Sequence, residues 1–247
     1  MLGRGHMMIS NVSVAMAVYN GGMYLKPQIE SILSQLLPDD ELVVSYDISS
    51  DDSLSIIQDY CNRDHRVVLV HNDRGGIVAN FNNAIKHCKN DAIFISDQDD
   101  LWLPNKRRKV VEALNRTGAD LVIHNGVHIN ENDEVISDSF FEMYKIGSSL
   151  LRNFVAPRYS GCCMAFSRKA MTYLYPMPLE VINYDHWIGM ACQLFGTVSY
   201  LDEVLLQHRL HGSNATTSRR GIKVIAAQRS ELVLKLIQRK LCHEEWE

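Results

Sequence analysis

Short apolar runs alternate with amphipathic stretches along the first half of this chain. Each run has the length of a buried strand, and in each following stretch apolar residues recur every three or four positions, as on one face of a helix. This alternation indicates right-handed crossovers and a mainly parallel sheet flanked by helices, which is an α/β fold. The predicted strand and helix pairs are 12–18 with 24–36, 41–45 with 51–61, 67–71 with 77–88, and 92–96 with 104–114.

The second half is less regular. Its predicted elements are strands 120–124, 126–130, 161–167 and 198–201, and a helix 185–195. No repeat, low-complexity stretch or flexible linker separates the halves, so we expect one shared core. With 247 residues, 46% of them hydrophobic, the chain suffices for one large domain. We divide this domain, 8–218, into a first half, 8–130, and a second half, 131–218.

Polar loops follow each of the first four predicted strands. They comprise residues 19–22, 47–51, 72–76 and 97–100. In a parallel sheet, ligands bind beyond the carboxyl ends of the strands, where these loops meet. This arrangement is typical of a nucleotide site, so the first half is predicted to bind a nucleotide and the second half the remaining substrate.

Three carboxylates, Asp97, Asp99 and Asp100, come directly after the apolar run 92–95. Carboxylates a few ångströms apart repel each other by roughly 4 kcal/mol per pair at an effective dielectric near 20, so a cation commonly neutralises such a cluster. Oxygen ligands favour Mg²⁺ or Mn²⁺, whose other ligands are often substrate phosphates. The alternative is a polar turn before the helix that Pro104 opens.

Composition narrows the setting. The formal net charge of −4 argues against wholesale nucleic-acid binding, and six cysteines without C-x-x-C or zinc spacing are interpreted as reduced packing residues. No run approaches a membrane span, and the start lacks a signal segment, so we expect a cytoplasmic protein. Residues 1–7 are interpreted as a cloning remnant.

Six motifs in order resemble those of glycosyltransferase family two, which has the GT-A fold. They cover roughly residues 11–215, and within the family the chain is similar to the bacterial rhamnosyltransferase-like branch. The motifs are Ala17-Val18-Tyr19-Asn20, Asp47-x-Ser49-x-Asp51, Asp97-x-Asp99-Asp100-x-Trp102-x-Pro104, Gly161-Cys162-Cys163, Asp185-x-Trp187 and Arg209-x-His211. The resemblance implies an inverting, metal-dependent enzyme that uses nucleotide sugars.

The resemblance also implies a nucleotide subsite. Tyr19 would offer an aromatic face to a pyrimidine, and Asp47 would accept from the base's ring N–H. The alternatives are core packing for Tyr19 and a solvated loop charge for Arg74. The implied nucleotide-binding residues are Ala17, Tyr19, Asp47, Asn72, Arg74, Gly76 and Asp97.

Metal and sugar contacts follow from the same resemblance. Asp99 would ligate the cation, and His211 would approach the cation and the diphosphate. For His211 a structural loop role remains the alternative. The residues implied on the side of the donor and acceptor sugars are Asp100, Trp102, Gly161, Cys162 and Trp187. Cys162 would act through its small size rather than as a nucleophile.

Asp185 is the candidate catalytic base, because the resemblance places it on the acceptor side, with Trp187 as a nearby apolar platform. Read locally, Asp185 could instead be the N-cap of its helix. His186 is either an auxiliary group or a solvent-facing side chain. The pair Tyr46 and Ile48 departs from the family's usual Asp and Gly, which predicts altered base recognition and a loop that either lacks a positive φ or is strained.

The C-terminal stretch 219–247 is predicted to form a basic amphipathic helix. Residues 219–241 carry seven Lys or Arg side chains beside apolar residues at helical spacing. Such a helix can lie on an anionic membrane at the inner face of the plasma membrane. The alternative is that its apolar face packs on the domain while its basic face is solvated.

The sequence therefore predicts the transfer of one sugar onto a saccharide or lipid-linked saccharide acceptor in surface polysaccharide synthesis. The expected donor is dTDP-rhamnose, with a UDP-hexose as runner-up, and the processive Gln-x-x-Arg-Trp motif is absent. Two alternatives are a haloacid-dehalogenase-type phosphatase, because an apolar strand ends in Asp97-x-Asp99, and a catalytically inactive nucleotide-sugar-binding module.

Overall fold

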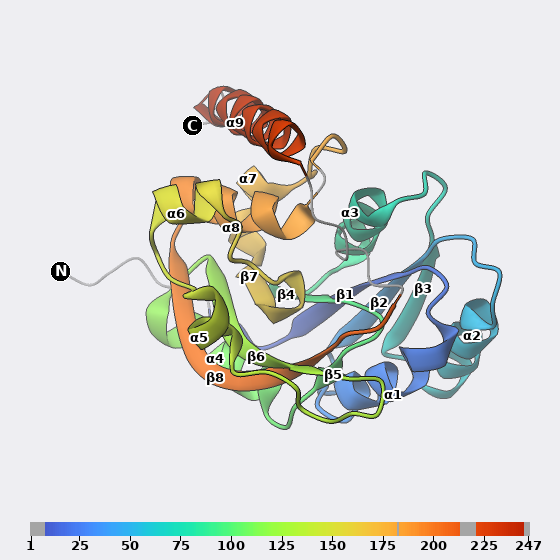
Figure 1. Cartoon of the computed structure of the whole chain (residues 1–247). Helices are drawn as coiled ribbons and strands as arrows, with labels where there is room; N and C mark the ends of the chain where they lie inside the picture. Colours follow the sequence, from blue (N-terminus) through green and yellow to red (C-terminus); the bar gives the residue numbers. More distant parts are fainter. Residues whose placement is uncertain (1–7, 182, 213–220, 245–247) are drawn as a thin grey trace.

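A computed structural model describes residues 8–181, 183–212 and 221–244 of the chain. Within them, one mixed, mostly parallel sheet of eight strands runs in the order β3-β2-β1-β4-β7-β6-β8-β5, with helices on both faces (Figure 1). The strands are β1 Val12–Val18, β2 Glu41–Tyr46, β3 Val67–His71, β4 Ala92–Ser96, β5 Leu101–Trp102, β6 Leu121–Ile129, β7 Met164–Ser167 and β8 Val198–Arg209.

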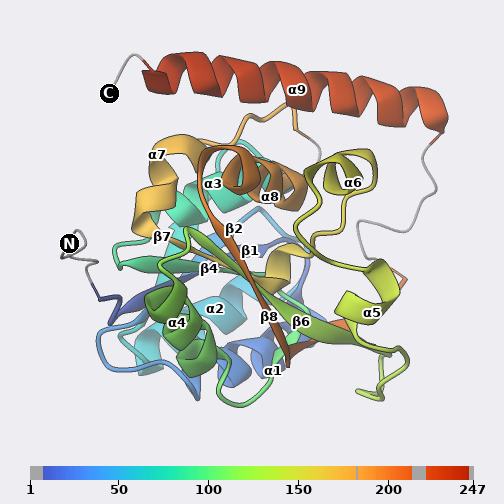
Figure 2. The ribbon, with the colours of Figure 1, turned by 90° about the vertical axis from the view of Figure 1, so that its left-hand side faces the viewer.

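The helices cover both faces of the sheet. Those with described bounds are α1 Gly22–Leu33, α2 Ser53–Arg63, α3 Ile77–His87, α4 Lys106–Thr117, α5 Phe140–Tyr144, α6 Leu150–Val155, α7 Met171–Leu174, α8 Tyr184–Phe195 and α9 Ile222–Glu244. Helices α1, α2 and α4 pack on one face, whereas α3, α7 and α8 pack on the other (Figure 2). Two hydrophobic layers therefore enclose the sheet.

Strand β1 lies near the middle of the sheet and explains the two layers. Its side chains alternate between faces, so that Val14 and Met16 join one core while Ala15 and Ala17 join the other. All seven residues of β1 are buried, as expected for a parallel strand covered on both faces. The carboxyl ends of β1, β2 and β4 consequently meet at one edge, because the three strands pair in parallel.

The second half enters the same sheet. Strand β7 pairs antiparallel with both β4 and β6, so both halves share one sheet and the cores on its two sides. The pairs among β1 to β4 are parallel, and the first antiparallel pairs occur at β7. The regular alternation of strand and helix predicted for the first half does not extend to this part of the sheet. The expectation of a shared core is therefore met by direct strand pairing between the halves.

Four predicted strands differ from the observed ones. In place of the predicted strands 120–124 and 126–130, one continuous strand, β6, covers Leu121–Ile129. Strand β7 starts only at Met164, because Gly161–Cys163 form a 3-10 turn. Strand β8 has 12 residues rather than four and pairs in parallel with β6, with register shifts, and antiparallel with β5. Beyond Leu201 the strand continues through a sequence of mixed polarity, and its end reaches the acidic residues.

Candidate active site

The polar loops after β1, β2 and β4 are joined by hydrogen bonds. The Tyr19 amide donates to Gln98 Oε1 at 2.9 Å, and Gln98 Nε2 donates back to the Tyr19 carbonyl at 3.0 Å. Asn20 binds the β2 loop, because its amide donates to Ser49 Oγ at 2.9 Å and its Oδ1 accepts from the Ser50 amide at 2.8 Å. The predicted meeting of these loops at one sheet edge is thus observed.

The candidate nucleotide subsite centres on Asp47, which is buried at the end of β2. Asn72 Nδ2 donates to one of its carboxylate oxygens, and the Gly76 amide donates to the other at 3.0 Å. Gly76 has φ of +91°, a conformation that favours glycine. A glycine at this position therefore lets the backbone amide approach the Asp47 carboxylate without strain. Asp47 therefore fixes the loop between β3 and α3.

The other predicted nucleotide residues take distinct positions. Tyr19 is 58% exposed, so the alternative that it packs in the core is wrong. Ala17 is buried in β1, whereas Arg74 is exposed and lines a cleft of about 740 Å³ together with Asn72. Ile48 is 86% exposed. Its φ is not positive, in agreement with the first of the two predictions for its loop.

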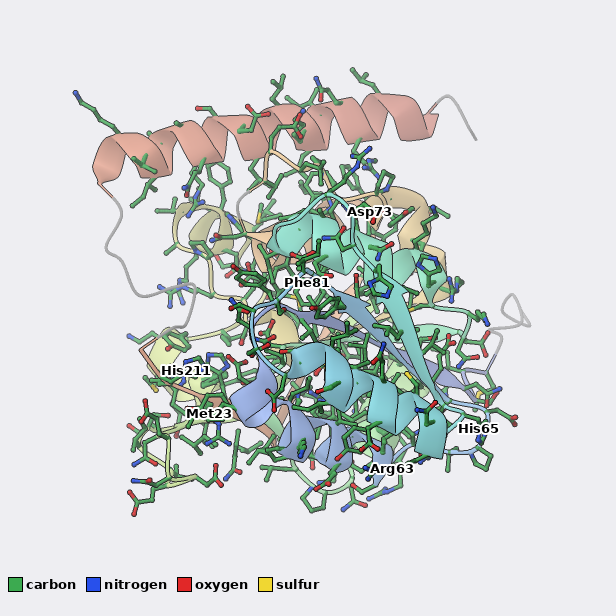
Figure 3. All side chains as sticks on the ribbon, turned by 90° about the vertical axis from the view of Figure 1, so that its right-hand side faces the viewer. Met23, Arg63, His65, Asp73, Phe81 and His211 are labelled. Atoms are coloured by element: carbon green, nitrogen blue, oxygen red, sulfur yellow. The ribbon has the colours of Figure 1, made fainter. Side chains whose placement is uncertain are left out.

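The three carboxylates lie at the end of β4, and each has a separate partner. Tyr184 Oη donates to Asp97 Oδ1 at 3.0 Å. His208 Nδ1 lies 2.7 Å from Asp100 Oδ1, and His211 Nε2 lies 2.8 Å from Asp99 Oδ2. His211 follows the end of β8, and the centre of its ring lies 4.9 Å from that of Tyr24 in α1. Figure 3 labels His211. The long strand β8 thus brings two histidines to the acidic cluster.

Burial and mutual repulsion disfavour the charged forms of two of these carboxylates. Burial, Asp100 and Asp99 raise the pKa of Asp97 to about 7. Burial and Asp100 also raise the pKa of Asp99. For Asp100, burial acts in the same direction, but the adjacent His208 outweighs it and lowers the pKa of the carboxyl. The cluster therefore carries negative charge that the surrounding protein only partly neutralises.

His208 was not predicted from the sequence, although it directly precedes the Arg209-x-His211 motif. Burial alone would lower the pKa of His208, but the Asp100 carboxylate raises it well above its ordinary value. When protonated, the imidazole forms an ion pair with Asp100, whose side chain is fully buried. The sequence signal that could have pointed to His208 is its place next to the Arg209-x-His211 motif. The direction of the His208 side chain follows only from the length of β8, which the sequence did not predict.

The cluster fits a divalent cation. Ligand atoms of Asp97, Asp100, Cys162 and His208 all lie within 4.8 Å of one another. Asp100 Oδ2 is buried and has no hydrogen-bond partner among the described residues. Such an orphaned carboxylate oxygen is costly unless a ligand binds it. Together with Asp99 beside His211, the carboxylate oxygens are the donors that Mn²⁺ and Mg²⁺ prefer.

Lys106 lies beside the acidic cluster and was not predicted from the sequence. Its side chain is fully buried, and Nζ donates to the Cys162 carbonyl at 2.8 Å and lies 4.3 Å from the centre of the Trp102 ring. Burial lowers the pKa of this ammonium to about 8. Trp102 itself is only 4% exposed and packs on Phe94, so the prediction that it contacts a sugar is wrong.

Trp187 is likewise a core residue. It is fully buried, and its indole N–H donates to the Leu174 carbonyl at 2.9 Å. The prediction of an apolar platform for the acceptor is therefore wrong, because the ring faces away from solvent into the layer beneath α7. Cys162 is only 1% exposed, so its small side chain does not open space for a donor sugar. The groups it can contribute to the site are its sulfur and its carbonyl.

Tyr184 fills the space that the glycine at 161 leaves. A Cβ added to Gly161 would lie 2.3 Å from the Tyr184 ring. The ring also packs on Phe81 of α3, with centroids 4.2 Å apart. Gly161 was predicted to let a donor sugar approach, but in the structure it admits Tyr184, whose hydroxyl thereby reaches Asp97.

We expect Gly161→Ala to destabilise the domain and to displace Tyr184 from Asp97. Inserting a methyl into such a contact typically costs about 1–3 kcal/mol. Gly147→Ala is the matched control, because a Cβ at Gly147 meets nothing within 4 Å. Chemical unfolding of both variants measures the difference in the free energy of unfolding. Equal stability of the two would show that Tyr184 can move without loss.

Asp185 lies half-buried in the first turn of α8, directly after Tyr184. The N-cap of this helix is Asn183, so the alternative that Asp185 serves as the N-cap is wrong. One of its oxygens, Oδ1, accepts from the His186 amide at 2.7 Å. Through Tyr184, the candidate base is tied to the acidic cluster.

His186 is buried rather than solvent-facing. Its Nε2 lies 3.1 Å from the Asn153 carbonyl, and its Nδ1 lies 3.3 Å from Arg229 Nη1. Burial and Arg229 lower its pKa to about 4, so the ring is neutral at pH 7. This histidine therefore joins α6, α8 and α9 and is not exposed beside the acceptor.

Comparison with known proteins identifies the family. The sequence profile "Glycosyl transferase family 2" matches residues 13–174, which is more than half of the chain. The chain belongs to glycosyltransferase family 2. This assignment removes the phosphatase alternative and makes the chain a glycosyltransferase. The predicted motifs at Asp47, Asp97–Asp100 and Gly161 all fall inside the matched segment.

Relatives and solved structures agree with this family. An uncharacterized glycosyltransferase from Nostoc sp. is 24% identical over 216 residues, covering 82% of this chain and 66% of that protein. The chain thus spans about two thirds of this relative's length. These likenesses support glycosyltransferase family 2 and do not extend to the rhamnosyltransferase-like branch.

The fold is the GT-A fold. TarS from S. aureus in complex with UDP-GlcNAc superposes with a TM-score of 0.70 at 17% identity, covering 93% of this chain and 72% of that chain. A mannosyltransferase, PcManGT from Pyrobaculum calidifontis, in complex with GDP-Man and Mn²⁺, gives 0.63 at 17% identity, covering 93% and 64%. Among the described residues, no helix is long and apolar enough to cross a membrane.

Proposed function

We propose that this chain is an inverting, metal-dependent glycosyltransferase that moves a single sugar from a nucleotide donor to a saccharide acceptor. The observation that carries the proposal is the link between two groups. Asp185 directly follows Tyr184, whose hydroxyl binds Asp97 of the acidic cluster at 3.0 Å. A carboxylate that can accept a proton is thus connected through Tyr184 to carboxylates that can hold a diphosphate's cation.

The donor is proposed to be dTDP-rhamnose, or a UDP-hexose as the second choice. Tyr19 supports a pyrimidine base, because its exposed ring stands at the end of β1 and can stack on a flat base. Asp47 lies one strand away, where its carboxylate can accept from a ring N–H. Asn72, Gly76 and Arg74 would line the base and diphosphate.

The cation, Mn²⁺ or Mg²⁺, is proposed to be held by Asp99 with His211, and by the free oxygen of Asp100. When bound, it stabilises the negative charge on the departing diphosphate. His208 and Lys106 are the protein's own cations at this point, and both lie next to Asp100 or its neighbour Cys162. They limit the repulsion among the carboxylates before any ligand binds.

The transfer itself forms a bond between the acceptor's hydroxyl oxygen and the anomeric carbon, while the bond from that carbon to the diphosphate oxygen breaks. Asp185 takes the hydroxyl proton as the oxygen attacks from the opposite face, which inverts the configuration. The nucleoside diphosphate leaves with the electron pair of the broken bond. The acceptor is proposed to be a saccharide or a lipid-linked saccharide of a surface polysaccharide.

A thermal-shift screen of nucleotide sugars with Mn²⁺ tests the donor. A donor at 100 times its dissociation constant stabilises the folded state by about 2.7 kcal/mol, which raises Tm by roughly 5–10 °C for a domain of this size. We expect dTDP-rhamnose or a UDP-hexose to give this shift and GDP-sugars to give none. Stabilisation by a donor without any transfer or slow donor hydrolysis would favour the inactive binding module.

A further inference from the structure

Three basic side chains of helix α9 contact the domain. Arg229 Nη1 lies 3.3 Å from His186 Nδ1, and Lys235 Nζ lies 2.7 Å from Glu180 Oε1. Arg239 donates to the carbonyls of Tyr173, Tyr175 and Pro176, at and just after the end of α7, with 2.8 Å to the Tyr175 oxygen. The sequence-based alternative, in which the basic face is solvated, is therefore wrong for these three residues.

Few apolar side chains of α9 pack on the domain. Leu232 and Leu236 are buried against the core beneath the helix, at 2% and 5% exposure. They lie on the same side as Arg229 and Arg239, because residues three and four apart share a helix face. The helix is thus fastened by a narrow apolar seam flanked by polar contacts.

The opposite side of α9 is apolar and exposed. Val233, Leu234, Ile237 and Leu241 are 39%, 49%, 52% and 58% exposed. At 3.6 residues per turn, Leu234 and Leu241 lie roughly half a turn away from the seam formed by Leu232 and Leu236, Ile237 about a third of a turn and Val233 about a quarter. Figures 2 and 3 show α9 as the outermost element, with one side toward α7 and α8 and the other turned away from the domain. We call these four side chains the outer face.

The charge beside the outer face is positive. Lys223 and Lys240 are exposed near the two ends of the helix. Among the α9 side chains that the structure describes, Glu231 is the only acid, and it lies 3.7 Å from Lys235. Apolar side chains with exposed lysines near both ends of the helix complement a surface of anionic headgroups over acyl chains.

We propose that the outer face of α9 binds an anionic lipid surface, with the helix lying flat and its inner face holding the domain. A second copy of the chain would gain too little area from the same face. A helix of 23 residues is about 35 Å long and about 10 Å wide, so two such faces bury roughly 700 Å², below the ~1,000 Å² of a stable interface.

This surface does not depend on the proposed transfer reaction, since no residue of the acidic cluster belongs to it. Its test is co-sedimentation with vesicles of phosphatidylcholine alone and with vesicles that also contain phosphatidylglycerol. We expect binding to increase with the phosphatidylglycerol fraction and to decrease with salt, because salt screens the lysines. Leu234→Ser with Ile237→Ser should weaken partitioning at least about tenfold, because apolar area drives insertion.

The matched control is Leu37→Ser with Ile136→Ser. These side chains are 48% and 52% exposed, close to the values for Leu234 and Ile237, but they lie outside α9. The control should bind vesicles like the parent, and circular dichroism should show that both variants fold. Equal binding by the two variants, or no binding by the parent, would overturn the proposal. If light scattering showed that the parent and the control are dimers and the α9 variant is a monomer, the outer face would bind a second copy of the chain. That result would equally overturn the proposal.

Discussion

Asp185→Asn should fold, bind donor and cation as tightly as the parent, and lose sugar transfer by at least about 10²-fold. A sugar hydroxyl is a poor nucleophile near neutral pH, and a positioned base typically contributes ~10²–10⁴ in rate, or about 3–5 kcal/mol. The amide keeps the size of the side chain and can still accept from the His186 amide. Steady-state kinetics with the stabilising donor, beside calorimetric donor affinity, measures the separation.

The control for this variant is Asp59→Asn. Asp59 also lies on a helix, but it is exposed on α2 and paired with Arg63, away from the acidic cluster. It should keep parental turnover, since exposed pairs contribute less than about 1 kcal/mol. Parental turnover by Asp185→Asn would exclude Asp185 as the base. Glu180 pairs with Lys235 and His186 is buried, so neither neighbour offers a ready replacement.

Removal of the cation should weaken binding of the nucleoside diphosphate by at least about 10²-fold, or about 2.7 kcal/mol. The three carboxylates otherwise repel the diphosphate, and burial already disfavours the charged forms of Asp97 and Asp99. Calorimetry of the diphosphate with Mn²⁺ and with EDTA measures this difference. Asp99→Asn should abolish it, because the variant loses a cation ligand beside His211.

The Asp99 and Asp185 variants should fail differently. Asp99→Asn should lose donor binding and turnover together, whereas Asp185→Asn should lose turnover alone. Asp59→Asn serves both experiments and should retain the full cation dependence. If the parent bound the diphosphate with equal affinity in Mn²⁺ and in EDTA, the cation would have no part in donor binding.

The first half of the fold was predictable because its signals are local. Strands β1, β3 and β4 were predicted with their observed bounds, since each is a buried apolar run between turn residues. Strand β8 was predicted only as 198–201. Its later residues mix polar and apolar types because it pairs with β6 and β5 and faces the site, which only the tertiary structure reveals.

The site was predictable in its carboxylates but not in their partners. Asp97, Asp99 and Asp100 stand together in the sequence, so their proximity follows from the chain itself. His208, Lys106 and Tyr184 reach the cluster through long-range contacts, which a single sequence does not encode as a pattern. The two tryptophans were misread because an aromatic beside a motif can equally be core.

The most direct test of the account follows the released sugar by proton NMR, after the stabilising donor is incubated with the protein and Mn²⁺. Water then takes the place of the acceptor, so hydrolysis is slow but its stereochemistry is readable. We expect the first sugar to appear with the anomeric configuration opposite to that of the donor, and Asp185→Asn to release it at least about 10²-fold more slowly. First release with the donor's own configuration would contradict the proposed displacement by a base-activated hydroxyl.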